Sequence, residues 1–491
     1  MTDRNKLSFY FLFVTTIFSF SAYGVEGDER PFKMLIRTTI PELSSDTEFL
    51  IRTKDFGYNY NVDCDNDGNF EATDVTGDYT CRYTVPDDYI VSISGIFPQL
   101  YYEQNDSDST KKIIDILQWG TQVWRSMEQA CYGCSNMIIT AADTPDLSQV
   151  TSMRNMFFGA QTFNQYIGDW NVSHVTDMNG LFEGASAFNQ SIYDWDVSKV
   201  TDMGNMFKSA TSFNQYIGDW DVSNVTNMSA TFLDATSFDQ PISDWNVGNV
   251  TNMGGMFVGA TSFNQYIGDW DVSKVTTMSA LFFRATSFNQ YIGDWDVSHV
   301  TDMSGMFSET SFNQYIGDWD VSSVATMSVM FNNAASFNQY IGVWDVSQVT
   351  KMERMFEGAT SFNKYIGNWD VSQVFLMRSM FSSAIVFNQY IGDWDISNVT
   401  QMNSMFDGAS SFNQYIGDWD ISNINSLMNL LVDTNLSTTN YDYILYNWSL
   451  LNVQRDITLD VGDTQYSDAG APFRQQLIDD FNWTITDGGP L

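Results

Sequence analysis

The stretch FNQYIGDWDVSNVTNMSATFLDATS, residues 213–237, recurs with few changes over more than half of the chain. Eleven copies can be aligned, and nine of the ten steps between them are 25 residues long; the remaining step, from Phe288 to Phe312, is 24. A short fixed period of this kind predicts a repeat array in which each copy packs against its neighbours. The copies begin at Phe163, Phe188, Phe213, Phe238, Phe263, Phe288, Phe312, Phe337, Phe362, Phe387 and Phe412.

The pattern within one copy predicts a short strand followed by a short helix. Between residues 217 and 222, apolar and acidic residues alternate, as in a strand with one buried face. From residue 225 onward, apolar residues recur at the three- and four-residue spacing of a helical face: Val225, Met228, Phe232 and Ala235. The expected fold is an α/β repeat solenoid of eleven coils over residues 163–435, with one short parallel strand and one short helix in each coil.

The repeat resembles that of the BspA-like bacterial surface proteins, a leucine-rich-repeat-like group with units of about 25 residues. The shared pattern, FNQ-Y-IGDWDVSNVT-M--MF-GATS, covers roughly residues 119–419. Members of that family are described as surface adhesins for host proteins. The resemblance therefore implies a non-catalytic binding or adhesion protein.

The first 24 residues have the order of an export signal. Arg4 and Lys6 precede a largely apolar run at residues 7–20, and small residues follow at 22–24. The run is short for a membrane span. We expect a secreted or cell-surface protein that is not inserted in a membrane after residues 1–24 are removed; an uncleaved anchor helix is the alternative.

The charge of the chain limits its partners. Sixty acidic residues against 22 lysines and arginines give a net charge of −38. Nucleic acid and anionic membranes both require a basic face, so neither is an expected partner. An acidic chain of this kind favours divalent cations instead.

Residues 32–103 lack the repeat and are expected to form an all-β sandwich. Five strand-like segments, at 32–39, 47–54, 58–65, 79–85 and 89–95, are separated by turn residues. The end of this region, with Tyr79, Tyr83, Pro86 and Tyr89, resembles a PKD-like Ig-type module, of a kind often found ahead of BspA-like repeats.

Three other segments complete the expected organisation. Residues 104–112 are predicted to be a polar linker, and residues 113–160 an N-terminal cap with an incomplete first coil. Residues 436–491 are predicted to be an α/β C-terminal cap, with helices at 436–447 and 471–481 and strands at 457–461 and 483–486. A repeat array requires such caps because its end coils have no neighbour.

The sandwich carries a candidate cation site. Acidic residues alternate in a loop that has Gly68 at the sixth position, and hard cations bind where several oxygens converge on one loop. The expected ligands of a Ca²⁺ ion are Asp63, Asp65, Asp67, Glu71 and Asp74. An acidic hairpin tip without a metal is the alternative, because strands and not helices flank the loop.

The four cysteines fall into two pairs. Cys64 and Cys81 lie on strands that are expected to pair, and export favours a disulfide between them. Cys131 and Cys134 occupy the Phe and Ala positions of a degenerate repeat, which favours two buried thiols; a local disulfide is the alternative.

Repetition aligns equal residues into columns on the surface. The residue three positions after the first Phe is Tyr in nine of the eleven copies, with Ser191 and Pro241 in the other two. We expect this column to bind a protein or glycan ligand, unless its rings merely stack on one another. The candidate ligand-binding residues are Tyr216, Tyr266, Tyr291, Tyr315, Tyr340, Tyr365, Tyr390 and Tyr415.

Two acidic columns flank each Trp, as Asp219 and Asp221 flank Trp220. Like charges this close repel each other unless turn N–H groups or bridging cations offset the repulsion.

The leading functional expectation is an exported binding protein with an extracellular protein or glycan ligand. A secreted glycan-active enzyme on a solenoid scaffold is the first alternative, but such an enzyme needs an acid, base or cation in particular coils. Departures from the repeat, such as Val343 and Lys364, are scattered, so we expect no enzyme. Ice binding by a Thr column that includes Thr176 and Thr201 is the second alternative; these residues lie at an expected helix start and not on a flat strand face.

Overall fold

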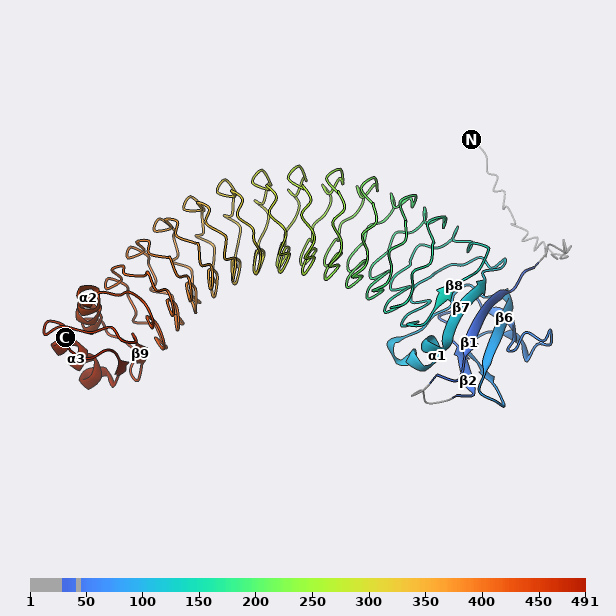
Figure 1. Cartoon of the computed structure of the whole chain (residues 1–491), viewed down its shortest axis with the longest axis horizontal. Coiled ribbons are helices and arrows are strands. Elements are labelled where there is room, and N and C mark those ends of the chain that lie inside the picture. Colours follow the sequence, from blue (N-terminus) through green and yellow to red (C-terminus); the bar gives the residue numbers. More distant parts are fainter. Residues whose placement is uncertain (1–28, 41–45) are drawn as a thin grey trace, which may run out of the picture.

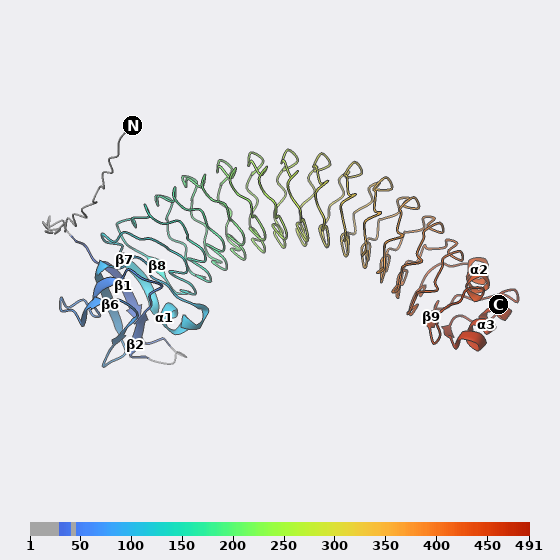
Figure 2. The same ribbon diagram turned by 180° about the vertical axis from the view of Figure 1, so that it is seen from behind.

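The computed structural model describes residues 29–40 and 46–491. The expected export signal at residues 1–24 lies outside these residues. The described chain forms a curved arc of coils, with strands at one end and helices at the other (Figure 1). Seen from behind, the coils lie side by side in sequence order along the whole arc (Figure 2).

The N-terminal head contains two sheets. The larger has the order β4-β3-β6-β1-β7-β8, and the smaller pairs β2 with β5. The five segments expected to be strands correspond to β1, β2, β3, β5 and β6, and β4 is an addition. The strands are β1 (Phe32–Arg37), β2 (Glu48–Ile51), β3 (Asn59–Asp63), β4 (Ala72–Val75), β5 (Tyr79–Arg82), β6 (Asp88–Ile96), β7 (Ile113–Gln118) and β8 (Ile138–Ile139).

The head is joined to the repeats through its larger sheet. β7 pairs antiparallel with β1 and parallel with β8, which belongs to the first coils. The prediction of a polar linker at residues 104–112 is therefore wrong. This segment folds as η1 (Gln104–Asp106) and α1 (Ser107–Lys112). It is held against β2 because Lys112 is buried and its Nζ donates to the carbonyl of Glu48 at 2.7 Å, while Arg52 pairs with Asp106 at 3.2 Å.

The short strand and short helix expected in each repeat are absent. Between α1 and α2 (Thr438–Ser449) the described chain contains no helix, and neighbouring coils share only single parallel bridges such as Asn227↔Asn252. Residues 228–235 form consecutive turns instead. Ala230 and Asp234 have φ of 53° and 55°, which an α-helix cannot contain, and the two equivalent positions are left-handed in all eleven repeats.

The turns are joined by a ladder of backbone hydrogen bonds, which we call the turn ladder. The N–H groups of residues 228, 230, 232 and 234 donate to carbonyls of the following coil, at 3.0, 2.9, 2.9 and 2.6 Å. The N–H groups of residues 231, 233 and 235 donate within their own coil, three residues back. This alternation satisfies the backbone without a strand or helix. The turn ladder begins at Met127, within the segment expected to be the N-terminal cap.

Side chains add further links between coils. The carboxamide oxygen of Asn214 accepts from the backbone N–H of Asp239 and from Nε2 of Gln240, both at 3.0 Å. The indole of Trp245 donates to the carbonyl of Ile217 in the preceding coil at 3.0 Å. These bonds recur along most of the array, so they set the register of one coil on the next.

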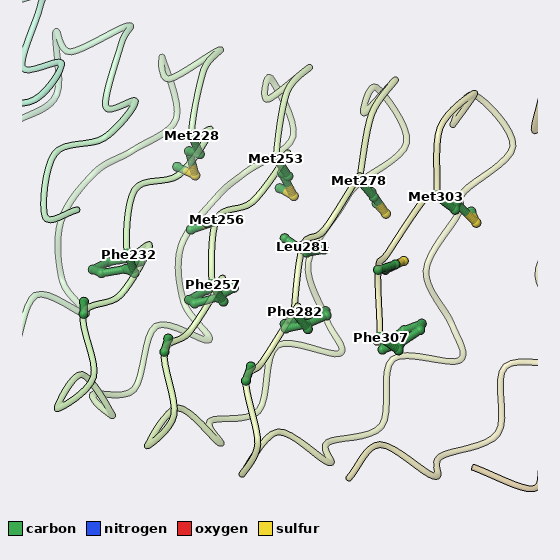
Figure 3. Close-up of a cluster of buried hydrophobic side chains, with 14 of the residues drawn as sticks. Met228, Phe232, Met253, Met256, Phe257, Met278, Leu281, Phe282, Met303 and Phe307 are labelled. Carbon is green, nitrogen blue, oxygen red and sulfur yellow. The ribbon is translucent and has the colours of Figure 1, made fainter. Parts of the chain in front are cut away.

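The core consists of columns of equal apolar residues. The Val, Met, Phe and Ala columns expected to face inward are buried, and Figure 3 shows the Met and Phe columns on successive coils. Ring centroids of neighbouring coils are 5.6 Å apart in the column of Phe232, 6.1 Å in that of Phe213 and 6.5 Å in that of Trp270. The spacing between coils therefore differs from one column to another, and the stack is curved (Figure 1).

The C-terminal segment covers the last coil with α2, β9 (Thr458–Asp460), α3 (Ala471–Phe481) and β10 (Thr484–Thr486). These are the two helices and two strands expected there. β9 pairs in parallel with β10, and Leu459 of β9 also bridges Leu427 of the last coil. No helix in the described part of the chain is long and apolar enough to cross a membrane.

The left-handed turn positions predict an unusual effect of glycine. Ala280 has φ of 53°, where an L-residue is strained by about 1–2 kcal/mol, so Ala280→Gly should raise the free energy of unfolding by up to about 1 kcal/mol. Ala335 is exposed and has no positive φ, so Ala335→Gly should lower this free energy by about 0.5–1 kcal/mol. Urea unfolding of both variants is the measurement. A loss of stability in both would contradict the turn geometry.

Candidate functional site

The tyrosine column, defined as Tyr216, Tyr266, Tyr291, Tyr315, Tyr340, Tyr365, Tyr390 and Tyr415, lies on the surface of the array. The first seven are 37–42% exposed, and Tyr415 is half-buried. No two consecutive members of the column have their rings in contact in the described chain. The alternative in which these rings stack on one another is therefore not what the structure shows.

Seven of the eight rings are instead held by a hydrogen bond within their own repeat. The hydroxyl of Tyr266 donates to Asp269 three residues later at 2.9 Å, and the same bond recurs in five other repeats. Tyr365 donates to Asn368 at 3.3 Å, whereas Val343 offers no acceptor to Tyr340. The first acidic column therefore orients the tyrosines.

A glycine two residues after the tyrosine allows this arrangement. A Cβ at Gly268 would lie 2.7 Å from the hydroxyl oxygen of Tyr266 and 2.7 Å from the carbonyl of Tyr291 in the next coil. The two repeats without Tyr in the column are also the two without this Gly: Ser191 is followed by Tyr193, and Pro241 by Ser243. The Tyr and the Gly two residues later thus occur together, because the ring lies over the glycine.

Tyr193 also belongs to this surface, although it was not among the residues expected from the sequence. Its ring lies 5.8 Å from that of Tyr216, and its hydroxyl donates to Asp219 at 2.9 Å. Tyr193 therefore restores an aromatic residue where Ser191 interrupts the column. The paired change from Tyr-Ile-Gly to Ser-Ile-Tyr was the signal available in the sequence.

The carboxylates also affect the acidity of the phenols. In five repeats the hydrogen bond to the Asp raises the pKa of the Tyr, and at Tyr415 burial, followed by Asp418, raises the pKa to about 12. The phenols therefore stay protonated at neutral pH and remain donors.

The second acidic column caps turns. The Oδ1 of Asp271 accepts the backbone N–H of Ser273 at 3.1 Å and the Ser273 hydroxyl at 2.6 Å, and these bonds lower the pKa of Asp271. The backbone bond recurs in the other repeats that have Asp at this position. Turn N–H groups thus offset the repulsion along this column.

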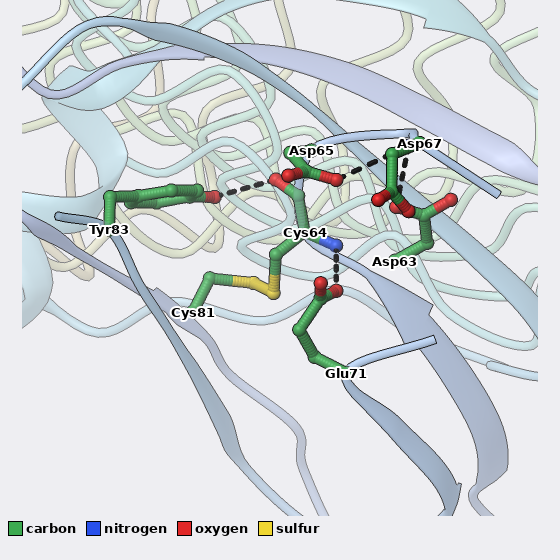
Figure 4. Close-up of a disulfide and its surroundings, with 7 residues drawn as sticks. All are labelled: Asp63, Cys64, Asp65, Asp67, Glu71, Cys81 and Tyr83. Carbon is green, nitrogen blue, oxygen red and sulfur yellow. Dashed lines mark hydrogen bonds between the residues drawn. A yellow bond between two sulfur atoms is a disulfide. The ribbon is translucent and has the colours of Figure 1, made fainter. Parts of the chain in front are cut away.

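A disulfide joins the two sheets of the head. Cys64 directly follows β3 of the larger sheet, Cys81 belongs to β5 of the smaller sheet, and their Cα atoms are 5.7 Å apart (Figure 4). This is the pair expected from the sequence. In the chain-entropy model, a loop of this size contributes about 3 kcal/mol to stability.

The acidic loop, residues 63–74, brings together three of the five expected metal ligands. Oxygens of Asp63, Asp65 and Asp67 lie within 4.8 Å of one another. Both oxygens of Asp63 accept backbone N–H groups, from Asp67 at 3.2 Å and Gly68 at 3.0 Å, so backbone bonds orient this carboxylate. In the described chain this is the one cluster of at least three acidic, His or Cys side chains that could hold a metal ion.

Glu71 and Asp74 lie outside this cluster. The Oε2 of Glu71 accepts the backbone N–H of Cys64 at 2.6 Å (Figure 4). Asp74 belongs to β4, which returns along β3, and its N–H donates to Asn61. A helix after the loop would have turned the last ligands inward, whereas the hairpin carries Asp74 away.

Cys131 and Cys134 are both buried and free. They occupy the Phe and Ala positions of the first coil of the turn ladder, since the N–H of Cys131 donates to the next coil at 3.0 Å. Burial raises the pKa of Cys134, so it is an unreactive thiol.

These features define a tandem-repeat protein with a strand-rich head and a surface of oriented tyrosines. The family model described as "Mycoplasma protein of unknown function, DUF285" matches residues 125–243, 193–290, 213–311, 290–383 and 338–448. The matches overlap and together span more than half of the chain, so the chain belongs to this family. No curated protein matches it.

The contact between ring and glycine predicts a coupling. Gly268→Ala should lower the free energy of unfolding by about 1–3 kcal/mol, because the ring of Tyr266 and a carbonyl must both shift. The same substitution in a Tyr266→Ser background should be less costly, because only the carbonyl remains in the way. Urea unfolding of a double-mutant cycle measures the difference. Strictly additive effects would show that the ring does not lie over the glycine.

The acidic loop is expected to bind Ca²⁺ with a dissociation constant of about 10⁻⁴–10⁻³ M. The affinity should be weak because only three carboxylates converge on the site and strands, not helices, flank the loop. Calorimetry on the full chain is the measurement, and Asp65→Asn with Asp67→Asn should abolish the binding heat. Glu71→Gln is the matched control and should retain binding, since Glu71 lies outside the cluster. Equal binding heat in the wild type, the double Asn variant and the Glu71→Gln variant would show that the loop is an acidic turn without a Ca²⁺ site.

Proposed function

We propose that this protein is an exported, non-catalytic surface protein of the BspA-like type, whose repeats form a solenoid that binds an extracellular protein or glycan. The observation that carries the proposal is the tyrosine column. Six of its rings are held by a hydrogen bond within their own repeat and are still more than a third exposed.

The chemistry of the column suits recognition. A ring already fixed by a carboxylate loses little conformational freedom when a ligand covers it. Tyrosine offers an apolar face to a sugar ring or an apolar side chain, and a polar edge that tolerates water. Because the unit recurs from coil to coil, one extended ligand can contact several rings, and weak contacts then add up through effective concentration.

Other features support the location and class of partner. The Cys64–Cys81 disulfide is typical of chains that fold in an oxidising compartment, in agreement with an export signal at residues 1–24. A net charge of −38 disfavours nucleic acid and anionic membranes. We propose in addition that the head is a PKD-like Ig-type module that displays the array away from the cell.

Binding to arrays of glycans and matrix proteins tests the proposal. The variant with Tyr266, Tyr291 and Tyr315 all changed to Ala should lose at least about tenfold in affinity for any ligand that the wild type retains, because removing aromatic anchors typically costs more than 1 kcal/mol each. The arrays also decide between a protein and a glycan.

The matched control changes Lys274, His299 and Ser323 to Ala, which are exposed residues of the same three repeats. This control should bind as the wild type does, and thermal unfolding should show that both triple variants are folded. A tyrosine variant that binds as well as the control would rule out the column as the binding surface.

A further inference from the structure

A pocket of about 370 Å³ lies between α2 and the start of α3, beyond the last coil. Four of its lining residues, Thr439, Asp442, Tyr443 and Tyr446, have the spacing of one helical face. The opposite face of α2 is buried in the hydrophobic core through Ile444, Leu445 and Trp448. The pocket is therefore formed by a helix whose position the core already fixes. Ala469 and Phe473 complete the lining.

Aromatic rings form the walls of this pocket, which we call the cap pocket. Tyr446 and Phe473 meet with ring centroids 4.8 Å apart and an interplanar angle of 72°. Tyr443 meets Tyr415, the last member of the tyrosine column, at 5.8 Å and 87°. Tyr443 and Tyr446 remain 50% and 42% exposed. The rings of Tyr446 and Phe473 thus line the pocket at a steep angle to each other, and the ring of Tyr443 adds a third aromatic surface.

The polar side of the cap pocket is negative. Asp442 lines it, and its carboxylate is held in place by the N–H of Ser467 at 3.0 Å and the Ser467 hydroxyl at 2.5 Å. Within the described chain no Lys, Arg or His lies within ion-pair distance of Asp442. Residues 436–491 contain eight Asp and only two Arg, one of which, Arg474, pairs with Asp487 at 2.7 Å. The local field therefore favours a cation.

From this geometry we infer that the cap pocket binds an organic cation with a methylated ammonium group. Ring faces attract such a group through their quadrupoles, and the quaternary centre, which donates no hydrogen bond, is suited to a site lined by rings. A neutral sugar is less suited, because the oxygens of Asp442 already accept from Ser467. The lining of the cap pocket shares no residue with the tyrosine column, which it adjoins through Tyr443 and Tyr415, and it takes a different ligand chemistry.

Calorimetric titration of the full chain with choline tests the inference. The comparison ligand is the uncharged carbon analogue of choline, in which a quaternary carbon replaces the quaternary nitrogen. Choline should bind, and the analogue should bind about tenfold more weakly, because it keeps the shape and loses the charge. Equal affinities, or no binding heat with choline at millimolar concentrations, would overturn the inference.

Variants locate the site. Tyr446→Leu and Asp442→Asn should each weaken choline binding by about tenfold, and Tyr443→Leu serves as a second ring variant if Tyr446→Leu is unstable. Tyr340→Leu, in the tyrosine column, is the matched control and should leave choline binding unchanged. The triple tyrosine variant of the array should also retain it, so failure of the proposed adhesion function is distinguishable from failure here. If both Tyr446→Leu and Tyr443→Leu bind choline as tightly as the wild type does, choline does not bind in the cap pocket and the inference is wrong.

Discussion

The structure depends on backbone hydrogen bonds that pass from one coil to the next. In nine of the eleven repeats, four N–H groups of the turn ladder donate to the following coil, and the intervening ones are satisfied locally. A coil with neither strand nor helix cannot satisfy these four groups by itself, and buried N–H groups without a partner are strongly destabilising. Folding of any coil is therefore conditional on its neighbours, and the apolar columns stabilise only a coil that is already paired. Curvature, register and surface columns all follow from this pairing.

The sequence predicted the repeat and which of its residues face inward, because burial depends on the spacing of the apolar residues. It did not predict the path of the backbone between those residues. Val225, Met228, Phe232 and Ala235 have helical spacing, but a series of turns with alternating hand places the same residues on one side. Of the twenty-two left-handed positions in the eleven repeats only seven are Gly, so the usual signature of positive φ was missing. At residues 104–112 the polar composition indicated a linker. The segment is instead packed on the head, where Lys112 is buried and donates to β2.

The surface features could be predicted only in part from the sequence. The tyrosine column was evident from repetition, but its connection to the glycine two residues later became clear only from the short distances between them. In the acidic loop, the spacing of five carboxylates suggested one cation site with five ligands, and the hairpin kept only Asp63, Asp65 and Asp67 together. The cap pocket depends on the packing of α2 against α3, a long-range contact that no local pattern encodes.

The direction of the turn ladder has one more consequence. Because its bonds run from each coil to the following one, the two faces of a coil are complementary but different. Such a contact between different faces is called heterologous, and a stack built from it can grow by adding further coils. A second copy of the chain contains the same coils, so a free end coil could pair with it. The head and the α2–α3 segment cover the two outer faces, which leaves no free coil face for head-to-tail addition of a second chain.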